Sequence, residues 1–508
     1  MSEERAPSAP PESMRSKARS AVPFVAASGL VGMVASLLGL LLLVRYLPQA
    51  EYGVWVLLSG LFTPISLFTS FGFTQSLLRF MPARTEQQER SELLWAVIGR
   101  RMASAALAAL ALVAGFPWLA PYFGVEGHFL AFLAVQPAIV ILAGSTLACA
   151  GLNVAFRQRE VFLASLTQQV LTLLAFAAGI VLRQPLEYFA AAFSVVSAAH
   201  LAVALRYCVR YFGAPRFGAL LRRPPERAGE ASYRRTSWVN EIADNLLSSD
   251  LNRYLLAAFS TTAEVATYVL AASLVQRLAS FQPMEIFRPL ATVSVFERFE
   301  RSGEIEDLNR TFHFLYGMNH LVTILYIALF LPLGTEALVW VFRAEYAAAY
   351  LPALFMFFSI GLFGMPVGLL ANALKRPQYL LYARVAVLLN VGLGIPLAAR
   401  YGASGMAFAV MVSLLVRNVI TYVLLRLEFN VRFPWAGFSR FVLAGAVAAA
   451  VSWLAARVVP LPVALALGSL AYLLCARGFG VLDPWERGAL VSLFPNRMQR
   501  AARLLVGT

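Results

Sequence analysis

The stretch "LLNVGLGIPLAARYGASGMAFA", from Leu388 to Ala409, joins two apolar runs through a short turn around Arg400. The runs cover 379–399 and 404–426, and each holds about the 20 apolar residues that one helix needs to cross a bilayer. Little more than the turn itself separates them. The stretch therefore predicts two membrane-spanning helices with a tight connection, and its recurrence elsewhere would decide the fold class.

The same pattern does recur along the whole chain. The sequence has 508 residues, of which 59% are hydrophobic and 14% are charged, whereas globular proteins carry about 25% charged residues. A transmembrane barrel would instead show short strands of alternating polarity. We therefore expect an all-α polytopic membrane protein with about 14 transmembrane helices. The expected spans are 22–44, 53–78, 94–118, 129–151, 161–182, 187–208, 238–259, 265–290, 311–333, 350–373, 379–399, 404–426, 438–458 and 461–481.

The basic residues predict the orientation of these spans. The net charge is +15, and Arg supplies almost all of the Lys+Arg total of 42. With a cytoplasmic N-terminus, the cytoplasmic tails and loops hold far more basic residues than the opposite side, as the positive-inside rule requires. We expect a multi-pass protein of the cytoplasmic (inner) membrane of a bacterium, with both termini in the cytoplasm. Membrane topology thus explains the positive charge, and nucleic acid is not expected as a partner.

The residues that usually carry catalysis are sparse. Three Cys and four His show no metal-binding or disulfide spacing. Neither of the two Lys follows a Gly, so there is no phosphate-binding loop. The longest connection, 209–237, is a basic linker and is too short for a catalytic domain. The sequence therefore predicts a transporter and not an enzyme, with no catalytic residues, no metal and no cofactor.

The basic linker divides the chain into halves that look alike. An Arg-Tyr-Leu sequence precedes a short turn and a new apolar run at both Arg45 and Arg253, and a second pair of similar segments surrounds Arg159 and Arg376. Both pairs have nearly the same offset, which predicts an internal repeat of six spans; coincidence between apolar segments is the other interpretation. The predicted parts are a basic tail 1–21, a first lobe 22–208, the linker 209–237, a second lobe 238–427, a helix pair 438–481 and an amphipathic tail 482–508.

The seventh span opens with charged residues. At 100° per residue, Glu241 and Asp244 share one helix face with Asn245, and this face should meet an aqueous cavity or a polar partner instead of lipid. Asp250 and Arg253 are three residues apart and can pair. Two interpretations remain open for these four charged residues: lining a cavity where H⁺ or Na⁺ couples to transport, or locking helices together.

Other spans contain arginines. Arg is suited to phosphate because its guanidinium donates two parallel hydrogen bonds to phosphate oxygens. Those near a cytoplasmic span end could instead extend to the membrane surface, and these are Arg288, Arg384, Arg100 and Arg101. The candidates for binding a diphosphate or a sugar are Arg277, Arg417, Arg288, Arg79 and Arg384.

Three segments resemble one family. They are "LLVRYLPQAEYG" from Leu42, "FGFTQSLLRF" from Phe71, and the stretch from Leu388 with its Tyr-Gly-x-x-Gly-x-Ala turn. The chain is similar over about 22–480 to bacterial polysaccharide and O-antigen flippases of the multidrug/oligosaccharidyl-lipid/polysaccharide exporter superfamily. The resemblance implies two pseudo-symmetric six-helix lobes around a central cavity plus two C-terminal helices. It also implies alternating access and an undecaprenyl-diphosphate-linked oligosaccharide as cargo, without identifying the sugar.

These observations together predict a flippase for an O-antigen or exopolysaccharide repeat unit. Its expected partners are a polyprenyl-diphosphate-linked glycan, membrane lipids and the polysaccharide polymerase machinery. A drug/cation antiporter of the same superfamily is the alternative, but it would need a net acidic cavity, and basic residues outnumber acidic ones in these spans. A membrane O-antigen polymerase or ligase would need a large periplasmic loop, and the predicted outer connections are short.

Overall fold

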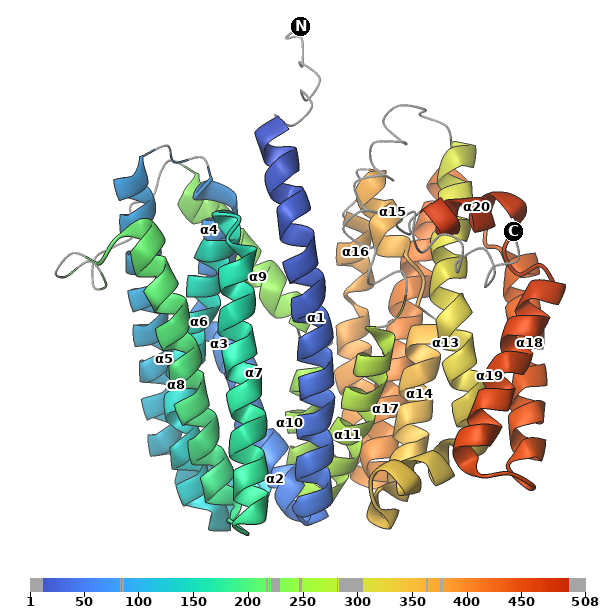
Figure 1. Ribbon diagram of the computed structural model, residues 1–508, viewed down its shortest axis with the longest axis horizontal. Coiled ribbons are helices and arrows are strands. Elements are labelled where there is room, and N and C mark those ends of the chain that lie inside the picture. Colours follow the sequence, from blue (N-terminus) through green and yellow to red (C-terminus); the bar gives the residue numbers. More distant parts are fainter. Residues whose placement is uncertain are drawn as a thin grey trace, which may run out of the picture. The chain divides into compact units, whose positions relative to one another are not determined.

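The computed structural model describes residues 12–82, 84, 86–215, 218, 220, 229–245, 249–280, 282, 305–361, 364–374, 376 and 378–492. Every regular element in this part of the chain is a helix (Figure 1). The helices group into two compact units, residues 1–258 and 259–508. The helices of both units have the same cause in the sequence. A long apolar run in lipid must satisfy its backbone hydrogen bonds within itself, and it therefore becomes a helix.

The first unit packs α6 against α8 and α5, and packs α1 against α7. Buried residues of α5, α6 and α8, such as Leu94, Leu147 and Ala204, form its core. Its elements are α1 (Glu12–Tyr46), α2 (Gln49–Gly60), α3 (Phe62–Ser70), α4 (Phe73–Phe80), α5 (Gln87–Phe123), η1 (Glu126–His128), α6 (Phe129–Val154), α7 (Gln158–Val181), α8 (Leu186–Phe212), α9 (Glu230–Asn245) and α10 (Ser249–Phe259).

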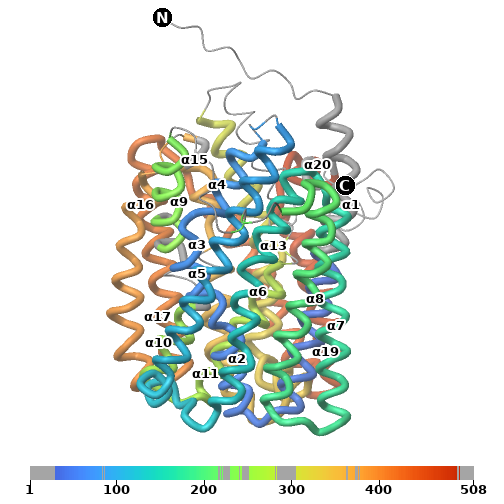
Figure 2. Tube along the Cα trace, turned by 90° about the vertical axis from the view of Figure 1, so that its left-hand side faces the viewer, coloured from blue at the N-terminus to red at the C-terminus, as the bar shows by residue number. Residues whose placement is uncertain are grey.

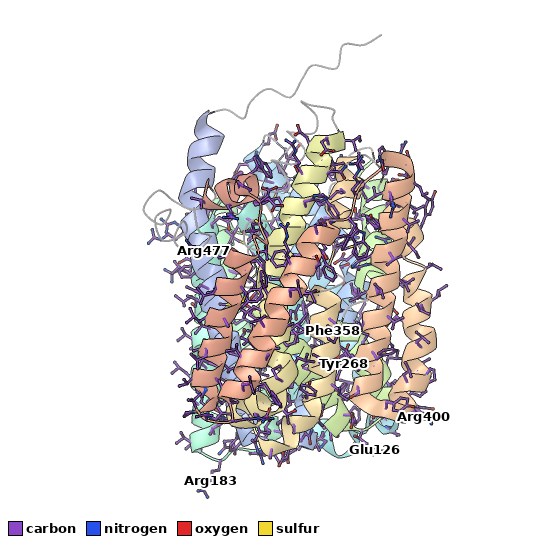
Figure 3. The ribbon with its side chains drawn as sticks, turned by 90° about the vertical axis from the view of Figure 1, so that its right-hand side faces the viewer. Glu126, Arg183, Tyr268, Phe358, Arg400 and Arg477 are labelled. Atoms are coloured by element: carbon purple, nitrogen blue, oxygen red, sulfur yellow. The ribbon has the colours of Figure 1, made fainter. Side chains whose placement is uncertain are left out.

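The second unit packs α18 against α19 and α13, and packs α14 against α17, α13 and α11. In Figure 3, Tyr268 and Phe358 lie at intermediate height, while Arg400 and Arg477 lie toward opposite ends of this unit. Its elements are α11 (Thr262–Ala279), α13 (Ile305–Val341), η3 (Ala344–Ala349), α14 (Tyr350–Gly361), α15 (Val367–Ala373), α16 (Gln378–Ala383), α17 (Ala386–Phe429), α18 (Trp435–Ala455), α19 (Leu461–Gly478) and α20 (Pro484–Ser492).

Most of the expected spans agree with these helices. Among the described residues, 11 helical stretches are long and apolar enough to cross a membrane. The expected spans 238–259 and 265–290 contain α9, α10 and α11 but are not among these stretches. One stretch, Gln378–Phe429, holds both the eleventh and the twelfth span because α17 is bent sharply within it. The prediction of an all-α, multi-pass membrane protein is confirmed.

The second span is broken into three pieces, α2, α3 and α4, which Figure 2 shows as successive segments of one crossing. Between α3 and α4 the backbone enters the left-handed region at Phe71 (φ 45°) and Gly72 (φ 69°). A side chain at Gly72 would place its Cβ 2.2 Å from the backbone oxygen of Arg234. Glycine is therefore required here, both by the positive φ and by the close approach of α9.

The turn in α17 explains the sequence from Leu388. Gly402 has φ 55° and ψ −134°, which breaks the helix. A Cβ at Gly405 would lie 2.0 Å from the Leu397 carbonyl oxygen. In a straight helix these positions would be about 12 Å apart, so the chain reverses here. The Glu264 carboxylate accepts the Ala403 backbone N–H at 2.7 Å and satisfies an otherwise unpaired donor at the start of the second half.

The boundary between the compact units does not fall in the basic linker. It falls after Ala258, so α9 and nearly all of α10, which form the seventh expected span, belong to the first unit. The six-span repeat beginning at 238 remains a prediction of the sequence. Helix α9 of the seventh expected span packs on α3 and α4 of the second expected span. The candidate site lies where these helices meet.

Candidate functional site

Helix α9 lies along the broken second span and packs on α3 and α4. The indole N–H of Trp238 donates to the Leu67 carbonyl oxygen at 2.7 Å. Arg234 donates from Nη1 to the Phe71 carbonyl oxygen at 3.3 Å, at the point where α3 ends. These donors satisfy carbonyls that the break leaves without helical partners. The polar character of the seventh span therefore has a structural cause in the irregular backbone beside it.

Helix α10 makes the same kind of contact further along. Arg253 is 8% exposed and donates from Nη1 to the Val56 carbonyl oxygen at 3.2 Å. Tyr254 donates its hydroxyl to the Leu57 carbonyl oxygen at 2.9 Å. The Leu61 N–H bonds to Leu58 at the α2–α3 joint, in an i to i−3 pattern, and so leaves the Leu57 oxygen for Tyr254.

Arg101 of α5 lies at the break itself. It is 2% exposed, and its Nη1 donates to the Thr74 hydroxyl at 2.8 Å while its Nη2 donates to the Ser66 hydroxyl. These two hydroxyls belong to α4 and α3, so the guanidinium bridges the Phe71–Gly72 break. Within the described part of the chain, no ion pair involves Arg101 and its Nε has no hydrogen-bond partner. This is a buried charge held by neutral groups, which is costly in a membrane.

Glu241 of α9 is the acidic group at this place. Its Oε2 accepts the Ser70 hydroxyl at 3.2 Å, and its carboxylate attracts the Arg101 guanidinium electrostatically. Ser70 is the last residue of α3. The break thus brings together a cation from α5, an anion from α9 and hydroxyls from α3 and α4.

A second buried arginine has a different environment. Arg84 is 1% exposed and its Nη2 lies 3.0 Å from Oε2 of Glu230, which is 2% exposed and opens α9. Both carboxylate oxygens accept from the guanidinium. This ion pair fixes the start of α9 to the connection between α4 and α5.

Three residues that the sequence predicts for the site remain in the first unit: Arg79, Asp244 and Asp250. Arg79 is exposed and lies over the ring of Tyr233, with 4.7 Å from Cζ to the ring centroid. Asp244 lies in α9 and Asp250 in α10, but their side chains are outside the described residues. The predicted pairing of Asp250 with Arg253 therefore remains a prediction.

Three candidates of the second unit, Arg277, Arg417 and Arg384, are half-buried. Arg277 donates from Nη1 to the Ser273 carbonyl oxygen at 3.2 Å, one turn back in α11. Arg417 donates to Oδ1 of Asn418 at 3.4 Å, and Arg384 lies at the joint between α16 and α17. Arg288 is outside the described residues. Their role in anion binding remains a prediction.

Arg101 was not among the arginines singled out as ligands, and extension to the membrane surface was one interpretation of it. The structure corrects that interpretation, because the guanidinium turns inward to Ser66 and Thr74. The polar run "TSFGFTQS" in the second span was the available signal, since buried hydroxyls need partners. What the sequence lacked was the packing of α5 on α3.

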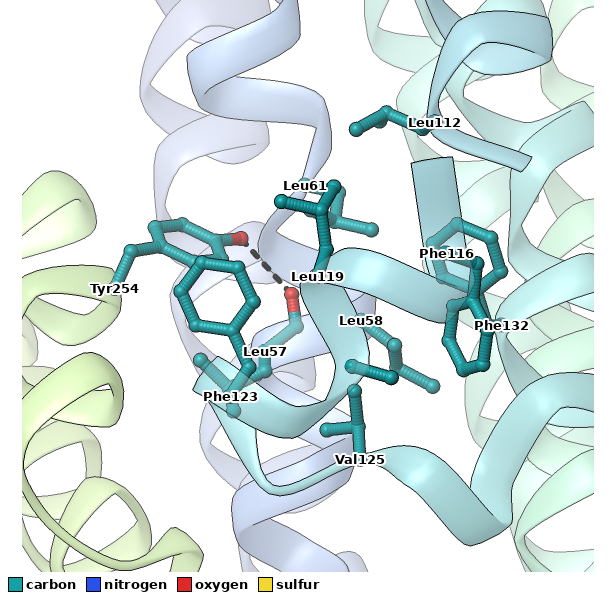
Figure 4. A pocket seen from close by; sticks show the side chains of 11 residues that line it. Leu57, Leu58, Leu61, Leu112, Phe116, Leu119, Phe123, Val125, Phe132 and Tyr254 are labelled. Atoms are coloured by element: carbon teal, nitrogen blue, oxygen red, sulfur yellow. Dashed lines mark hydrogen bonds between the residues drawn. The ribbon is translucent and has the colours of Figure 1, made fainter. Parts of the chain in front are cut away.

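An apolar pocket lies near the α2–α3 joint (Figure 4). Leucine and phenylalanine side chains line most of it, and the Tyr254–Leu57 hydrogen bond crosses one side. Its lining residues are Leu57, Leu58, Leu61, Leu112, Phe116, Leu119, Ala120, Phe123, Val125, Phe132 and Tyr254. Elsewhere, no group of three or more His, Cys, Asp or Glu among the described residues could hold a metal ion.

Several solved structures share this fold. The lipid II flippase MurJ in an inward closed conformation has a TM-score of 0.71 at 12% identity, covering 89% of this chain and 98% of that one. An inward-facing multidrug resistance MATE family transporter of the MOP superfamily has a TM-score of 0.57 at 12% identity, covering 78% and 94%. A mutant of the Vibrio cholerae MATE transporter VcmN has a TM-score of 0.52 at 17% identity, covering 82% and 98%. No curated protein matches the sequence.

The fold and the recurring apolar helices define a multi-pass membrane protein built of helices, and its fold is that of the solved flippase and transporter structures above. A family model described as "Polysaccharide biosynthesis protein" matches residues 22–284, which is more than half of the chain. The chain belongs to this polysaccharide biosynthesis family.

Proposed function

We propose that this protein is a flippase that translocates an undecaprenyl-diphosphate-linked oligosaccharide, an O-antigen or exopolysaccharide repeat unit, across the bacterial cytoplasmic membrane. The observation that carries the proposal is the match of 22–284 to a polysaccharide biosynthesis family on a chain with the fold of a lipid II flippase. That structural neighbour is a flippase for lipid II. The shared requirement would be a path for a charged, sugar-bearing headgroup through a medium of low dielectric.

The sign of the buried charge supports an anionic cargo over a cationic drug. The charged side chains that are buried in the described part of the chain are Arg84, Arg101, Arg253, Glu230 and Glu486. Arg84 and Glu230 neutralise each other, and Glu486 lies in the short helix α20 that follows the last span. Arg101, the buried arginine of the spans that is in no ion pair among the described residues, favours binding of a diphosphate. An antiporter for cations would need the opposite balance.

In the proposed cycle, the headgroup enters from the cytoplasmic side while the prenyl tail stays in lipid, and alternating access presents the sugar outside. The diphosphate would contact Arg277, Arg417, Arg288, Arg79 and Arg384. A proton or Na⁺ would couple at Glu241, Asp244, Asp250 and Arg253. Both termini would be cytoplasmic, and the polysaccharide polymerase would remove the product. The protein would make and break no covalent bond, unlike a polymerase or ligase.

The test is export of surface polysaccharide by a strain that lacks the chromosomal gene, normalised to the amount of the protein in the membrane. Arg277→Ala should lower export roughly ten- to hundredfold, because charge-assisted hydrogen bonds contribute about 1.5–3 kcal/mol. Arg277→Lys should retain part of the activity, and Arg277→Glu should abolish it. Full export by Arg277→Glu at normal abundance would remove this residue from the site. Failure of the wild-type gene to restore export would contradict the proposed function itself.

A further inference from the structure

We infer that the end of the last membrane span carries a binding site for the phosphate headgroup of an anionic membrane lipid, built by Arg440, Arg477 and Arg487. Arg440 lies near the start of α18, Arg477 in the last turn of α19, and Arg487 in α20, all within the second unit. None of the three is among the arginines proposed to bind the cargo. The inference therefore does not depend on the proposed function.

Two of these arginines converge on one residue of the backbone. Gly480 lies in the connection between α19 and α20, and its carbonyl oxygen accepts a hydrogen bond from Nη1 of Arg440 at 3.0 Å. Arg487 donates from Nε to the Leu482 carbonyl oxygen at 2.9 Å, and its Nη2 lies 3.7 Å from the position that a Cβ would take at Gly480. Neutral carbonyl groups thus hold two guanidinium groups on one short segment. Like charges placed in this way repel each other, and a bound anion would offset the repulsion.

The protein itself supplies no anion for these arginines. Among the described residues, none of the three is in an ion pair. The acidic side chains of the same segment, Asp483 and Glu486, cap α20 reciprocally: Oδ1 of Asp483 accepts the Glu486 N–H at 2.7 Å, and Oε2 of Glu486 accepts the Asp483 N–H at 2.8 Å. The sequence after Ser492 holds three Arg and no Asp or Glu, so its side chains add only positive charge. An anion that binds here must come from another molecule.

Exposed aromatic side chains place this segment at the membrane surface. Phe479 and Trp485 are exposed beside the arginines, and so is Trp435 at the start of α18. Aromatic residues gather at the level of the lipid headgroups. Arg477 is exposed too and lies toward the end of this unit opposite to Arg400 (Figure 3). The phosphates of a bilayer lie at this depth, so they are within reach of the three guanidinium groups.

The other end of the α18–α19 pair offers a comparison. Arg457 is also exposed there, and its Cζ lies 3.9 Å from the ring centroid of Trp453. The connection between these two helices contains no second arginine. Arg457 therefore has the ordinary composition of an interface anchor, whereas the arginines around Gly480 converge. An acidic protein segment is the other partner that a basic surface could bind, but the exposed rings and the position at the end of two spans favour a lipid.

The experiment measures binding of single lipids to the full-length protein in detergent by native mass spectrometry. The probes are phosphatidylglycerol, which is anionic, and phosphatidylcholine, whose phosphate is neutralised by its choline. The wild type should prefer phosphatidylglycerol about a hundredfold, since each arginine near a phosphate contributes about fivefold. Arg440→Gln with Arg487→Gln should weaken binding of phosphatidylglycerol about 25-fold and leave binding of phosphatidylcholine unchanged.

Arg457→Gln is the matched control, because it removes an exposed arginine beside a tryptophan at the opposite interface. The 21 residues of α18 separate the two ends by about 30 Å. This is beyond the Debye length of about 10 Å, so the affinity should change by less than about twofold. A second variant, Arg440→Lys with Arg487→Lys, keeps both charges and should retain most of the preference.

Thermal unfolding separates loss of folding from loss of binding. With phosphatidylcholine alone, the double glutamine variant should unfold near the wild-type temperature, because neither side chain is fully buried. Added phosphatidylglycerol should raise the unfolding temperature of the wild type, as a ligand of the folded state does, and should raise that of the double variant much less.

Two results would overturn the inference: an unchanged lipid preference in the double glutamine variant, or an equal loss of preference in Arg457→Gln. Binding of soluble glycerol phosphate as tight as that of phosphatidylglycerol would also overturn it, by assigning the arginines to a soluble anion. Equally tight binding of a polyglutamate peptide, lost in the double variant, would replace the lipid by an acidic protein segment. The export assay with the Arg277 variants tests the proposed function separately.

Discussion

Arg84 and Arg101 are both buried arginines of the first unit, yet the groups that their side chains contact differ. Arg84 is in an ion pair, with its Nη2 at 3.0 Å from Oε2 of Glu230. Arg101 donates to two hydroxyls and is in no ion pair among the described residues. The exposed fractions of the two residues are nearly equal, at 1% for Arg84 and 2% for Arg101. The difference between them is therefore one of partners and not of depth.

This difference in partners distinguishes an arginine that stabilises the fold, Arg84, from one with a role in function, Arg101. Removing one member of a buried ion pair leaves the other charge uncompensated, so Arg84 should matter most for stability. A buried charge with neutral partners gives less stability in return for its desolvation, and its retention is better explained by a ligand. The three predictions below test this separation, in order of the expected change in the free energy of unfolding.

The largest effect is expected for Arg84→Gln. It leaves the Glu230 carboxylate buried and unpaired, and should lower the free energy of unfolding by about 3–5 kcal/mol. Thermal unfolding of the detergent-purified protein measures this. Arg376→Gln is the matched control, since its ion pair with Glu428 is partly exposed (43% and 38%) and should change stability by less than about 1 kcal/mol. Equal losses in the two variants would remove the argument from burial.

Gly72→Ala should have the next largest effect. Its φ of 69° disfavours a side chain, and the new Cβ would meet the Arg234 carbonyl oxygen at 2.2 Å. Gly480→Ala is the control, with φ 60° and no atom nearer than 3.7 Å to the added Cβ. The control should lose roughly 1–2 kcal/mol from backbone conformation alone. Gly72→Ala should lose about 1–3 kcal/mol more through overlap. Equal values would mean that α9 does not hold the break in place.

The smallest change in stability is expected for Arg101→Gln. Ser66 and Thr74 can return their hydroxyls to their own helices, so the free energy of unfolding should fall by about 1 kcal/mol or less. Export of polysaccharide should nevertheless be lost. Parallel measurements of unfolding and export in Arg84→Gln and Arg101→Gln check the contrast. A destabilisation of Arg101→Gln as large as that of Arg84→Gln would make both arginines structural.

The membrane spans could be predicted because their cause is local. An apolar run of sufficient length must be helical in lipid, whatever it packs against. The turn at Gly402 was equally visible, since Arg400 and Gly402 interrupt two such runs. The breaks within the second span were harder to predict from the sequence. Phe71 has a φ of 45°, and no property of a phenylalanine in an apolar run indicates it.

The candidate site depends on contacts between distant segments, and this is why it could be only partly predicted. The helical period groups Glu241 on a polar face, but it cannot show that the Ser70 hydroxyl lies beside it. Arg101 could also be assigned to the membrane surface by its position near a span end. Its actual direction follows from Ser66 and Thr74, on helices that the linear sequence does not place next to α5.

The reversal at Gly402 has a consequence for biogenesis. The eleventh and twelfth spans share one helical stretch, Gln378–Phe429, with a turn instead of a loop between them. Glu264 satisfies the backbone at this turn only after α11 is in place, since its carboxylate accepts from Ala403. We therefore expect the translocon to release the two spans together as a helical hairpin, which completes its capping only against an earlier-synthesised helix.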